Sequence, residues 1–398
     1  MQHVKEYVRT IIDGYSSEKF RGFISHLRER EDRELLAEEL REAVSAVPEE
    51  NLFFRNVLLN ELETLEGNIV LKSRIRSFMV TLTNRCNLSC RMCEARRYPW
   101  DMPEEIVKEI REGFPYLEYI MWQGGEVFMK EYFGEMLDEA GRHPHMKQLI
   151  VTNGLMLDEK LIDKLTLQPD LVLAISMDGE DEKLYEGIRT GADFHKLRHN
   201  LAMLNRKRAE KRSKLALNLN VVVMKANYRH LPGLLELARE EHFSSVLFRP
   251  IQGNRDDEQN IFVNRDEEAL KEIGRMRPEL ERRAREYGIH LDNRLPSGSK
   301  TESEVLPAAE DTGERFFCAA PWQRLYISWG GNVYPDCMCV NPRDTGIGNV
   351  TRNTVREIWN NDGMQSYRRK IFGRQHRDLC GPDCVTGLVP DDYLRFNR

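Results

Sequence analysis

The sequence predicts an α/β protein built around a parallel β-sheet. Six short runs rich in Val, Ile and aromatic residues follow one another between residues 77 and 250. Each run is followed by an amphipathic stretch in which apolar residues recur three and four positions apart. Strands that alternate with helices in this way pair in parallel, and the helices cover the faces of the sheet. An open doubly wound sheet and a partial barrel both fit this pattern.

The predicted β/α units occupy residues 74–293. Their strands are expected at residues 77–83, 118–123, 147–153, 171–177, 216–223 and 245–250. Their helices are expected at residues 103–114, 130–142, 158–166, 194–208, 228–241 and 265–288. In parallel folds the functional groups gather just past the carboxyl ends of the strands, so the residues that follow each strand are the candidates for a site.

The region before these units, residues 1–73, is predicted to be a helical extension. Residues 4–15, 18–29 and 33–44 space their apolar side chains as helices do. We find no catalytic pattern there. We therefore expect the extension to lie on the main domain or to shape its opening.

The region after the units is predicted to contain a linker and a small second domain. Residues 294–315 are polar and contain Pro, Ser, Gly and acidic residues, which is typical of a linker. Residues 316–398 form the predicted second domain, with a β-hairpin at 324–335 and a helix at 355–373.

Composition narrows the class of protein. The chain has 398 residues and a net charge of −6, with an isoelectric point of about 6.0. This charge gives no electrostatic reason to expect nucleic acid or an anionic membrane as the main partner. No apolar run reaches roughly 18 residues, and the N-terminus lacks the layout of a signal peptide. We therefore expect a cytoplasmic protein, in which clustered cysteines bind metal rather than form disulfides.

The eight cysteines fall into two groups, three within residues 86–93 and five after residue 317. Cys86, Cys90 and Cys93 follow the first predicted strand with the spacing Cys-x3-Cys-x2-Cys. Three thiolates can hold three irons of a cubane 4Fe–4S cluster and leave the fourth iron open. Zinc is the alternative, but a structural zinc site needs a fourth ligand, and this loop contains no His.

The loop TNRCNLSCRMC, residues 83–93, resembles the signature of the radical S-adenosylmethionine (radical SAM) superfamily. The resemblance implies a partial (β/α)6 TIM-like barrel, with the 4Fe–4S cluster bound by Cys86, Cys90 and Cys93. The open iron would chelate the amino and carboxylate groups of S-adenosylmethionine. Reductive cleavage would then give a 5′-deoxyadenosyl radical that abstracts a hydrogen atom from the substrate. Met92 stands where the family often has an aromatic residue, and we expect it to cover the adenine.

Further residues at strand ends match the family's S-adenosylmethionine contacts. Glycines allow a ligand to approach the backbone closely, and a carboxylate can accept hydrogen bonds from an ammonium group. For Asp178, a role as a turn residue or helix cap is equally compatible with the sequence. For Arg189, the alternative is an ordinary surface arginine. The resemblance assigns S-adenosylmethionine binding to Gly124, Gly125, Glu126, Asn153, Ser176, Asp178 and Arg189.

The C-terminal cysteines resemble the SPASM and twitch extensions of radical SAM enzymes, which carry auxiliary 4Fe–4S clusters. The full SPASM pattern has seven cysteines, whereas this region has five, so we expect one auxiliary cluster. Zinc remains an alternative here, because four closed cysteines suit it. The expected ligands are Cys318, Cys337, Cys380 and Cys384. Cys339 is left over, and it is a candidate ligand in place of Cys337, a structural thiol or a hydrogen-atom donor.

These observations predict a radical SAM enzyme that modifies a peptide or protein. The alternative is a dehydrogenase or epimerase of a small molecule such as a sugar or aminoglycoside. A non-catalytic zinc protein that binds a partner is the more remote alternative. The implied partner is an electron donor such as a flavodoxin or ferredoxin, and no nucleic acid or membrane is expected.

Overall fold

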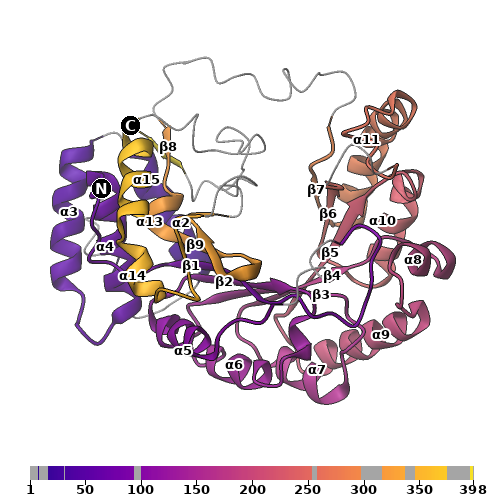
Figure 1. Cartoon of the computed structure of the whole chain (residues 1–398), viewed down its shortest axis with the longest axis horizontal. Coiled ribbons are helices and arrows are strands. Elements are labelled where there is room, and N and C mark those ends of the chain that lie inside the picture. The colour runs from indigo at the N-terminus through magenta and orange to yellow at the C-terminus, as the bar shows by residue number, and fades with distance from the viewer. Residues whose placement is uncertain are drawn as a thin grey trace.

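A computed structural model describes residues 8, 17–30, 32–93, 100–252, 258–296, 316–336, 346–373 and 395–397 of the chain. Its main feature is a curved sheet with helices along its outer side (Figure 1). No helix of this described part is both long and apolar enough to cross a membrane.

The six predicted strands form the middle of this sheet, parallel and in chain order. They are β1 (Ser77–Thr83), β2 (Tyr119–Gly124), β3 (Lys147–Thr152), β4 (Leu171–Ser176), β5 (Ala216–Val223) and β6 (Ser245–Pro250). A strand that sequence reasoning missed, β7 (His290–Asn293), extends the sheet beyond β6. The sheet is curved and has its helices along the outer side, which confirms the partial barrel over the open doubly wound sheet (Figure 1).

The other edge of the sheet comes from the C-terminal region. Strand β9 (Arg324–Ile327) pairs in parallel with β1, and β10 (Asn332–Tyr334) and β11 (Gly348–Asn349) follow antiparallel. The short helix η5 (Trp329–Gly331) forms the hairpin turn between β9 and β10. The sequence predicted this hairpin, but not that it joins the main sheet into one of ten strands.

Helices follow the strands and cover the convex side (Figure 1). Most begin at an Asp whose carboxylate accepts a backbone N–H of the first turn, as Asp181 does for Leu184 at 2.9 Å. The α-helices are α5 (Glu104–Gly113), α6 (Phe133–Ala140), α7 (Glu159–Thr166), α8 (Glu182–Ile188), α9 (Phe194–Glu210), α10 (Leu231–Glu240) and α11 (Glu267–Tyr287). Short 3-10 turns occur at η2 (Phe114–Tyr116), η3 (Val127–Met129) and η4 (Tyr228–His230).

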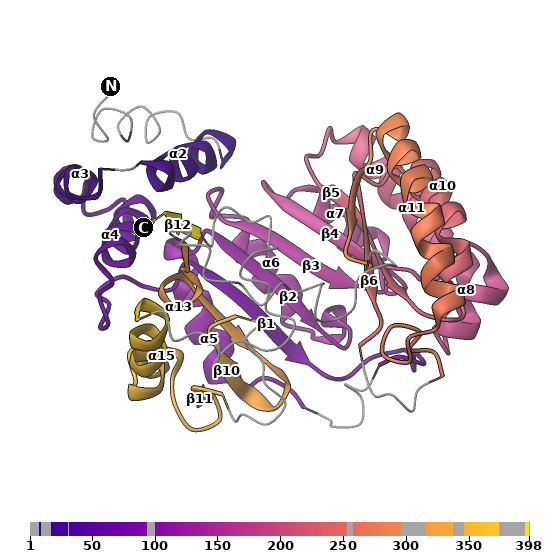
Figure 2. The ribbon, with the colours of Figure 1, turned by 90° about the horizontal axis from the view of Figure 1, so that it is seen from above.

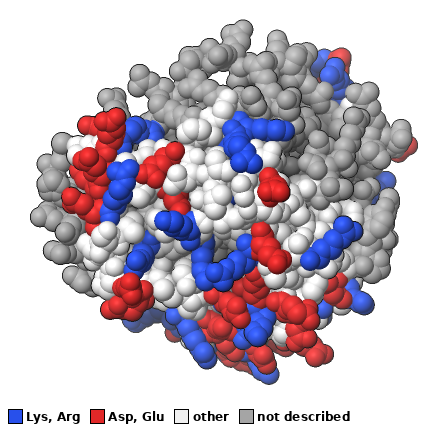
Figure 3. Space-filling view, turned by 60° about the vertical axis from the view of Figure 1, so that its left-hand side comes forward, with Lys and Arg blue, Asp and Glu red and all other residues white. Residues whose placement is uncertain are grey.

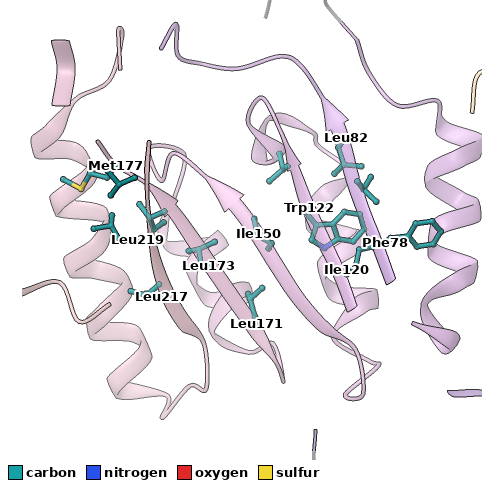
Figure 4. Close-up of a cluster of buried hydrophobic side chains, with 14 of the residues drawn as sticks. Phe78, Leu82, Ile120, Trp122, Ile150, Leu171, Leu173, Met177, Leu217 and Leu219 are labelled. Atoms are coloured by element: carbon teal, nitrogen blue, oxygen red, sulfur yellow. The ribbon is translucent and has the colours of Figure 1, made fainter. Parts of the chain in front are cut away.

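The two faces of the sheet differ because successive side chains point to opposite faces. Phe78 and Leu82 of β1, Trp122 of β2 and Leu217 of β5 lie in the buried cluster between the sheet and the helices (Figure 4). The residues between them point to the other, concave face, where many are only half-buried. The concave face is therefore the part of the sheet that remains accessible.

The N-terminal helices have a hydrophobic core of their own. They are α2 (Ser17–Glu29), α3 (Arg33–Ala46) and α4 (Leu52–Glu66), and they lie at one end of the molecule (Figure 2). The ring centroids of Phe20, Phe53 and Phe54 lie 5.2 to 5.5 Å apart in this core.

On the face turned toward the viewer in Figure 3, positive and negative side chains of the described residues intermingle rather than form a field of one sign.

The C-terminal region contributes β8 (Phe316–Cys318), α13 (Ala320–Gln323), α14 (Val355–Trp359), α15 (Asp362–Phe372) and β12 (Arg395–Asn397). The single helix expected at 355–373 is two helices, because Asn361 caps α15 by accepting the N–H of Met364 at 2.8 Å. Strand β12 pairs with β8 and contacts α2 (Figure 2). Of the predicted linker, residues 297–315 lie outside the described residues.

Candidate functional site

The cysteine loop leaves the end of β1 and is anchored there by Asp101. The Thr83 hydroxyl and Arg85 Nε donate to the two Asp101 oxygens, at 2.6 and 2.7 Å. Lys130 forms an ion pair with the same carboxylate at 3.0 Å. Burial alone would raise the pKa of Asp101, but hydrogen bonds from Thr83, Lys130 and Arg85 outweigh it and lower the pKa to about 2. The start of the loop is thus tied to an ionised carboxylate.

The glycine pair at the end of β2 lies directly against this loop. The N–H of Gly125 donates to Thr83 O at 2.7 Å. Gly124 has φ +140°, and a Cβ there would lie 2.2 Å from Thr83 O. A Cβ on Gly125 would lie 2.1 Å from Arg85 O. Side chains at these two positions would push the loop away, which explains the glycines.

Glu126 is fully buried, and its carboxylate joins the ends of β2 and β3. It accepts the Thr152 hydroxyl at 2.8 and 2.9 Å and the Asn153 N–H at 2.9 Å. The Phe128 N–H adds a longer bond of 3.3 Å. Burial raises the pKa of Glu126, while these donors lower it. The structure therefore shows Glu126 as a support for the strand ends; contact with S-adenosylmethionine is an additional, proposed role.

Asn153 reaches the cysteine loop from β3. Its Nδ2 donates to Asn87 Oδ1 at 2.8 Å and lies 3.9 Å from Cys86 Sγ. Its Oδ1 accepts the Leu155 N–H at 3.0 Å, which fixes the amide. Asn153 thus connects the third strand end to the first cysteine.

Cys90 is held by the segment that follows α8. Backbone N–H groups of Ser89 and Arg91 donate to the carbonyls of Thr190 and Ile188, at 2.8 and 2.9 Å. The side chain of Arg189 also reaches Cys90, with Nη1 3.7 Å from Sγ.

Arg189 is paired with Asp178 at the end of β4. Its Nη2 lies 2.7 Å from Asp178 Oδ2, and the two side chains are 8% and 0% exposed. Asp178 Oδ1 accepts the Val222 N–H at 2.7 Å. The site thus contains an almost fully buried ion pair beside a cysteine sulfur.

The three thiols differ in exposure: Cys86 and Cys90 are half-buried and Cys93 is exposed. Burial raises the pKa of the Cys86 and Cys90 thiols, and the neighbouring sulfurs raise it further. No three His, Cys, Asp or Glu side chains within the described ranges are arranged around a single metal ion. A cubane spreads its ligands over separate irons, so it does not need such convergence.

Three buried polar atoms near Cys90 have no hydrogen-bond partner among the described residues: Arg189 Nε, the Tyr185 hydroxyl and Asp178 Oδ2, the last of which lies 2.7 Å from Arg189 Nη2 in the ion pair. Buried polar groups are normally satisfied, so these atoms are able to hydrogen-bond a molecule bound beside Cys90. Thiolates are ligands that suit iron. Hydrogen-bond donors without a partner suit a carboxylate or another acceptor. The residues present therefore fit an iron–sulfur cluster with a small polar molecule beside it.

The other predicted site residues have simpler surroundings. Ser176 is half-buried at the end of β4, and no hydrogen bond of its hydroxyl occurs within the described part of the chain. Met92 lies against Ile188, Met224 and Ile251, a small apolar cluster next to the loop. The adenine-covering role of Met92 stays a prediction.

Sequence reasoning missed Tyr185 and Thr152. Tyr185 is fully buried, and burial raises its pKa. Its signal was available, because it precedes Arg189 by four residues, the spacing of one helical turn. Thr152 carries the Glu126 contact, and its signal was its place before Asn153 and Gly154 at the end of the third predicted strand.

The C-terminal cysteines are described only in part. Cys318 is half-buried in β8, opposite Arg395 of β12. Cys337, Cys339, Cys380 and Cys384 lie outside the described residues.

Two family descriptions match the chain. The Radical SAM superfamily matches residues 80–238. The SPASM family, an iron–sulfur cluster-binding domain, matches residues 318–385. These two domains imply 4Fe–4S clusters and S-adenosylmethionine as cofactors.

Similar proteins point the same way. Fe-coproporphyrin III synthase of Methanosarcina barkeri is 23% identical over 75% of this chain and 78% of its own length. The structure of Streptococcus suis SuiB bound to S-adenosylmethionine has a TM-score of 0.59 at 16% identity, covering 85% of this chain and 78% of SuiB. The structure of SuiB bound to the precursor peptide SuiA has a TM-score of 0.56 at 16% identity. It covers 78% of this chain and 70% of SuiB.

A further structure is anSMEcpe with bound AdoMet and the Cp18Cys peptide, with a TM-score of 0.52 at 18% identity. It covers 75% of this chain and 83% of anSMEcpe. At these identities the structures show a shared fold. The family matches favour an enzyme over the alternative of a non-catalytic zinc protein. The chain belongs to the radical SAM superfamily and carries a SPASM iron–sulfur domain at its C-terminal end.

Proposed function

We propose that this enzyme abstracts a hydrogen atom from a residue of a peptide or protein, as a maturase does. Cys86, Cys90 and Cys93 hold the 4Fe–4S cluster that, when loaded, supplies radical chemistry through S-adenosylmethionine. Gly124, Gly125, Glu126, Asn153, Ser176, Asp178 and Arg189 line the place of S-adenosylmethionine. Cys318, Cys337, Cys380 and Cys384 hold one auxiliary cluster, with Cys339 as a candidate hydrogen-atom donor.

The observation that carries the peptide assignment is a set of carboxamides on the concave face. Gln123 of β2 and Asn218 and Asn220 of β5 alternate with residues of the buried cluster, so they point away from the helices. All three are half-buried, and no side-chain hydrogen bond of theirs occurs within the described part of the chain. A carboxamide offers both a donor and an acceptor, as a peptide bond does.

Next to these amides, toward the amino ends of the strands, the concave face is apolar. Met79 of β1, Met121 of β2 and Leu149 of β3 are register neighbours, and all are half-buried. Methionine adapts to side chains of different shape. Side-chain amides without a hydrogen-bond partner among the described residues, next to an apolar surface, support a substrate that has a polar backbone and an apolar side chain. SuiB and anSMEcpe, whose structures contain peptides, share this fold.

A small-molecule substrate is the second candidate, and two observations favour it. The chain resembles Fe-coproporphyrin III synthase over most of both lengths. Lys147 and Arg324 are half-buried on the concave face at the amino ends of β3 and β9, where cations could bind carboxylates. Arg324 is partly neutralised by Asp336 at 3.3 Å, which weakens this reading relative to the peptide.

We further propose that the enzyme works in the cytoplasm with a flavodoxin or ferredoxin as electron donor. A reducing compartment keeps cysteine thiols available for iron.

The test is deuterium transfer from candidate substrates encoded near the gene. The full-length, anaerobically reconstituted enzyme is given S-adenosylmethionine, a reductant and a deuterated peptide. Deuterium in 5′-deoxyadenosine supports the peptide assignment. Deuterium transfer only from a small molecule, such as a carboxylated tetrapyrrole, overturns it and supports the second candidate.

A matched pair of variants tests the amides. Asn220→Ala should raise KM for the peptide about five- to thirtyfold and leave peptide-independent cleavage of S-adenosylmethionine unchanged, since one lost polar contact is worth about 1 to 2 kcal/mol. Asn353→Ala, at an exposed position of the C-terminal region, should change neither. Equal KM values for both variants would remove the carboxamide argument.

A further inference from the structure

Cys90 is bracketed by the segment that contains Arg189. The two residues that flank Cys90 donate their backbone N–H groups to the two residues that flank Arg189, at 2.8 and 2.9 Å. Between these two bonds, Arg189 Nη1 lies 3.7 Å from Cys90 Sγ. Because the backbone bonds fix the separation of the segments, the fold sets the contact between guanidinium and sulfur.

Arg189 is also held from the opposite side. Its Nη2 pairs with Asp178 at 2.7 Å, and Asp178 is anchored by the Val222 N–H. Carboxylate, guanidinium and sulfur therefore form one connected chain. Both charged side chains are nearly inaccessible, so water and salt screen their effect on the sulfur only weakly.

The other two cysteines lack a comparable contact. Cys86 receives the Leu88 N–H at 3.4 Å and the Asn153 amide at 3.9 Å, both neutral donors. Cys93 is exposed, and no donor to its sulfur occurs among the described residues. Within this part of the chain, a charged donor reaches the sulfur of Cys90 alone.

A cation near a cysteine ligand stabilises the more negative, reduced state of an iron–sulfur cluster and raises its reduction potential. Arg189 is always charged. Asp178 carries the opposite charge and is held next to Arg189 by the buried ion pair. The two side chains should therefore shift the potential in opposite directions.

We propose that Arg189 and Asp178 set the reduction potential of the cluster held by Cys90. Arg189 acts through the cysteine sulfur as a positioning residue, beyond the contact with S-adenosylmethionine that the family resemblance implies. This rests on the proposed function only in taking Cys86, Cys90 and Cys93 as ligands. Reduction adds one electron, from a flavodoxin- or ferredoxin-type donor, and no bond of the protein forms or breaks.

The test is a potentiometric titration of the full-length, reconstituted protein without S-adenosylmethionine, followed by electron paramagnetic resonance. Arg189→Gln should lower the ratio of reduced to oxidised cluster at fixed potential by about tenfold or more, a shift of about 59 mV to more negative values. Asp178→Asn should shift the potential the other way. Loosening of the site alone would not move the two variants in opposite directions.

Three further variants complete the test. Arg189→Lys keeps the charge and should fall between the wild type and Arg189→Gln. Arg198→Gln removes an arginine that pairs with Glu241 at 2.6 Å on the outer helices, and it should leave the potential unchanged. The Cys86→Ala/Cys90→Ala/Cys93→Ala protein provides the signal of the auxiliary cluster for subtraction.

Arg189→Gln with an unchanged potential and weakened S-adenosylmethionine binding overturns the proposal, because Arg189 then acts on the substrate alone. If the triple cysteine variant binds as much iron as the wild type, the ligand assignment fails as well. Shifted potentials without turnover of any peptide support this proposal and contradict only the peptide substrate.

Discussion

Two buried arginines, Arg76 and Arg189, lie at opposite ends of the parallel sheet. Arg76 precedes β1 at the amino end and is 1% exposed. It pairs with Glu61, and its Nε and Nη2 donate to Glu118 at 3.2 and 2.6 Å. Asn60 accepts a further bond at 3.3 Å. This guanidinium is surrounded by acceptors from α4 and from Glu118, the residue before β2.

Arg189, at the carboxyl end, has a less complete environment. It has one carboxylate and one sulfur, and its buried Nε has no partner among the described residues. A satisfied buried network fixes structure, whereas an unsatisfied one has capacity for a ligand. The amino end of the sheet is thus joined to helix α4, whereas the carboxyl end is the candidate site for the chemistry.

The largest expected effect comes from removing the three loop cysteines. Cys86→Ala/Cys90→Ala/Cys93→Ala should abolish formation of 5′-deoxyadenosine and lose about four irons per chain. Chromatography of 5′-deoxyadenosine and iron analysis measure this. Far-ultraviolet circular dichroism should not change, because the Arg76 joint lies at the other end. Residual 5′-deoxyadenosine in this variant would show that the loop is not the site.

The next effect in size is at the amino end. Arg76→Met should lower the free energy of unfolding by about 3 to 5 kcal/mol, because Glu61 and Glu118 would lose their buried counter-charge. Urea unfolding of the apoprotein measures it. Arg282→Gln, on the exposed side of α11, removes ion pairs with Glu279 and Glu286 and should cost less than about 1 kcal/mol. Equal losses in the two variants would contradict a buried joint.

The smallest effect concerns the carboxylate that anchors the cysteine loop. Asp101 has a pKa of about 2 in the folded protein, below its ordinary value of 3.8. Its ionised form therefore stabilises the fold above pH 3.8, and this contribution is lost as the pH falls through about 2. Asp101→Asn should cost at most about 2 kcal/mol at neutral pH.

Urea unfolding of the wild-type and Asp101→Asn apoproteins at several pH values measures this difference. The two should approach equal stability near pH 2. A difference that does not change with pH would mean that the carboxylate charge is not what anchors the loop.

Much of the fold was readable because local patterns and tertiary environment agree. The strand predicted at 77–83 is β1 (Ser77–Thr83), since its short run of apolar and β-branched residues suits a strand buried within a parallel sheet. The pairing of β9 with β1 was not readable. It depends on contacts between segments more than 200 residues apart, such as the bond from Asn60 Nδ2 to Trp322 O at 2.6 Å.

The candidate site was readable as a set of residues, but not as an arrangement. Spacing identified Cys86, Cys90 and Cys93, and strand ends identified Glu126 and Asp178. Local sequence did not show that the Glu126 carboxylate accepts hydrogen bonds from Thr152 and Asn153. These contacts depend on which strands are neighbours.

By itself, the sequence determined the chemistry of this protein, because three cysteines at this spacing leave a coordination position open and hydrophobic periodicity defines the strands. Only the tertiary structure decided how that chemistry is tuned. Cys90 and Arg189 are 99 residues apart. Burial brings them together with Asp178 and excludes the water that would otherwise screen their charges.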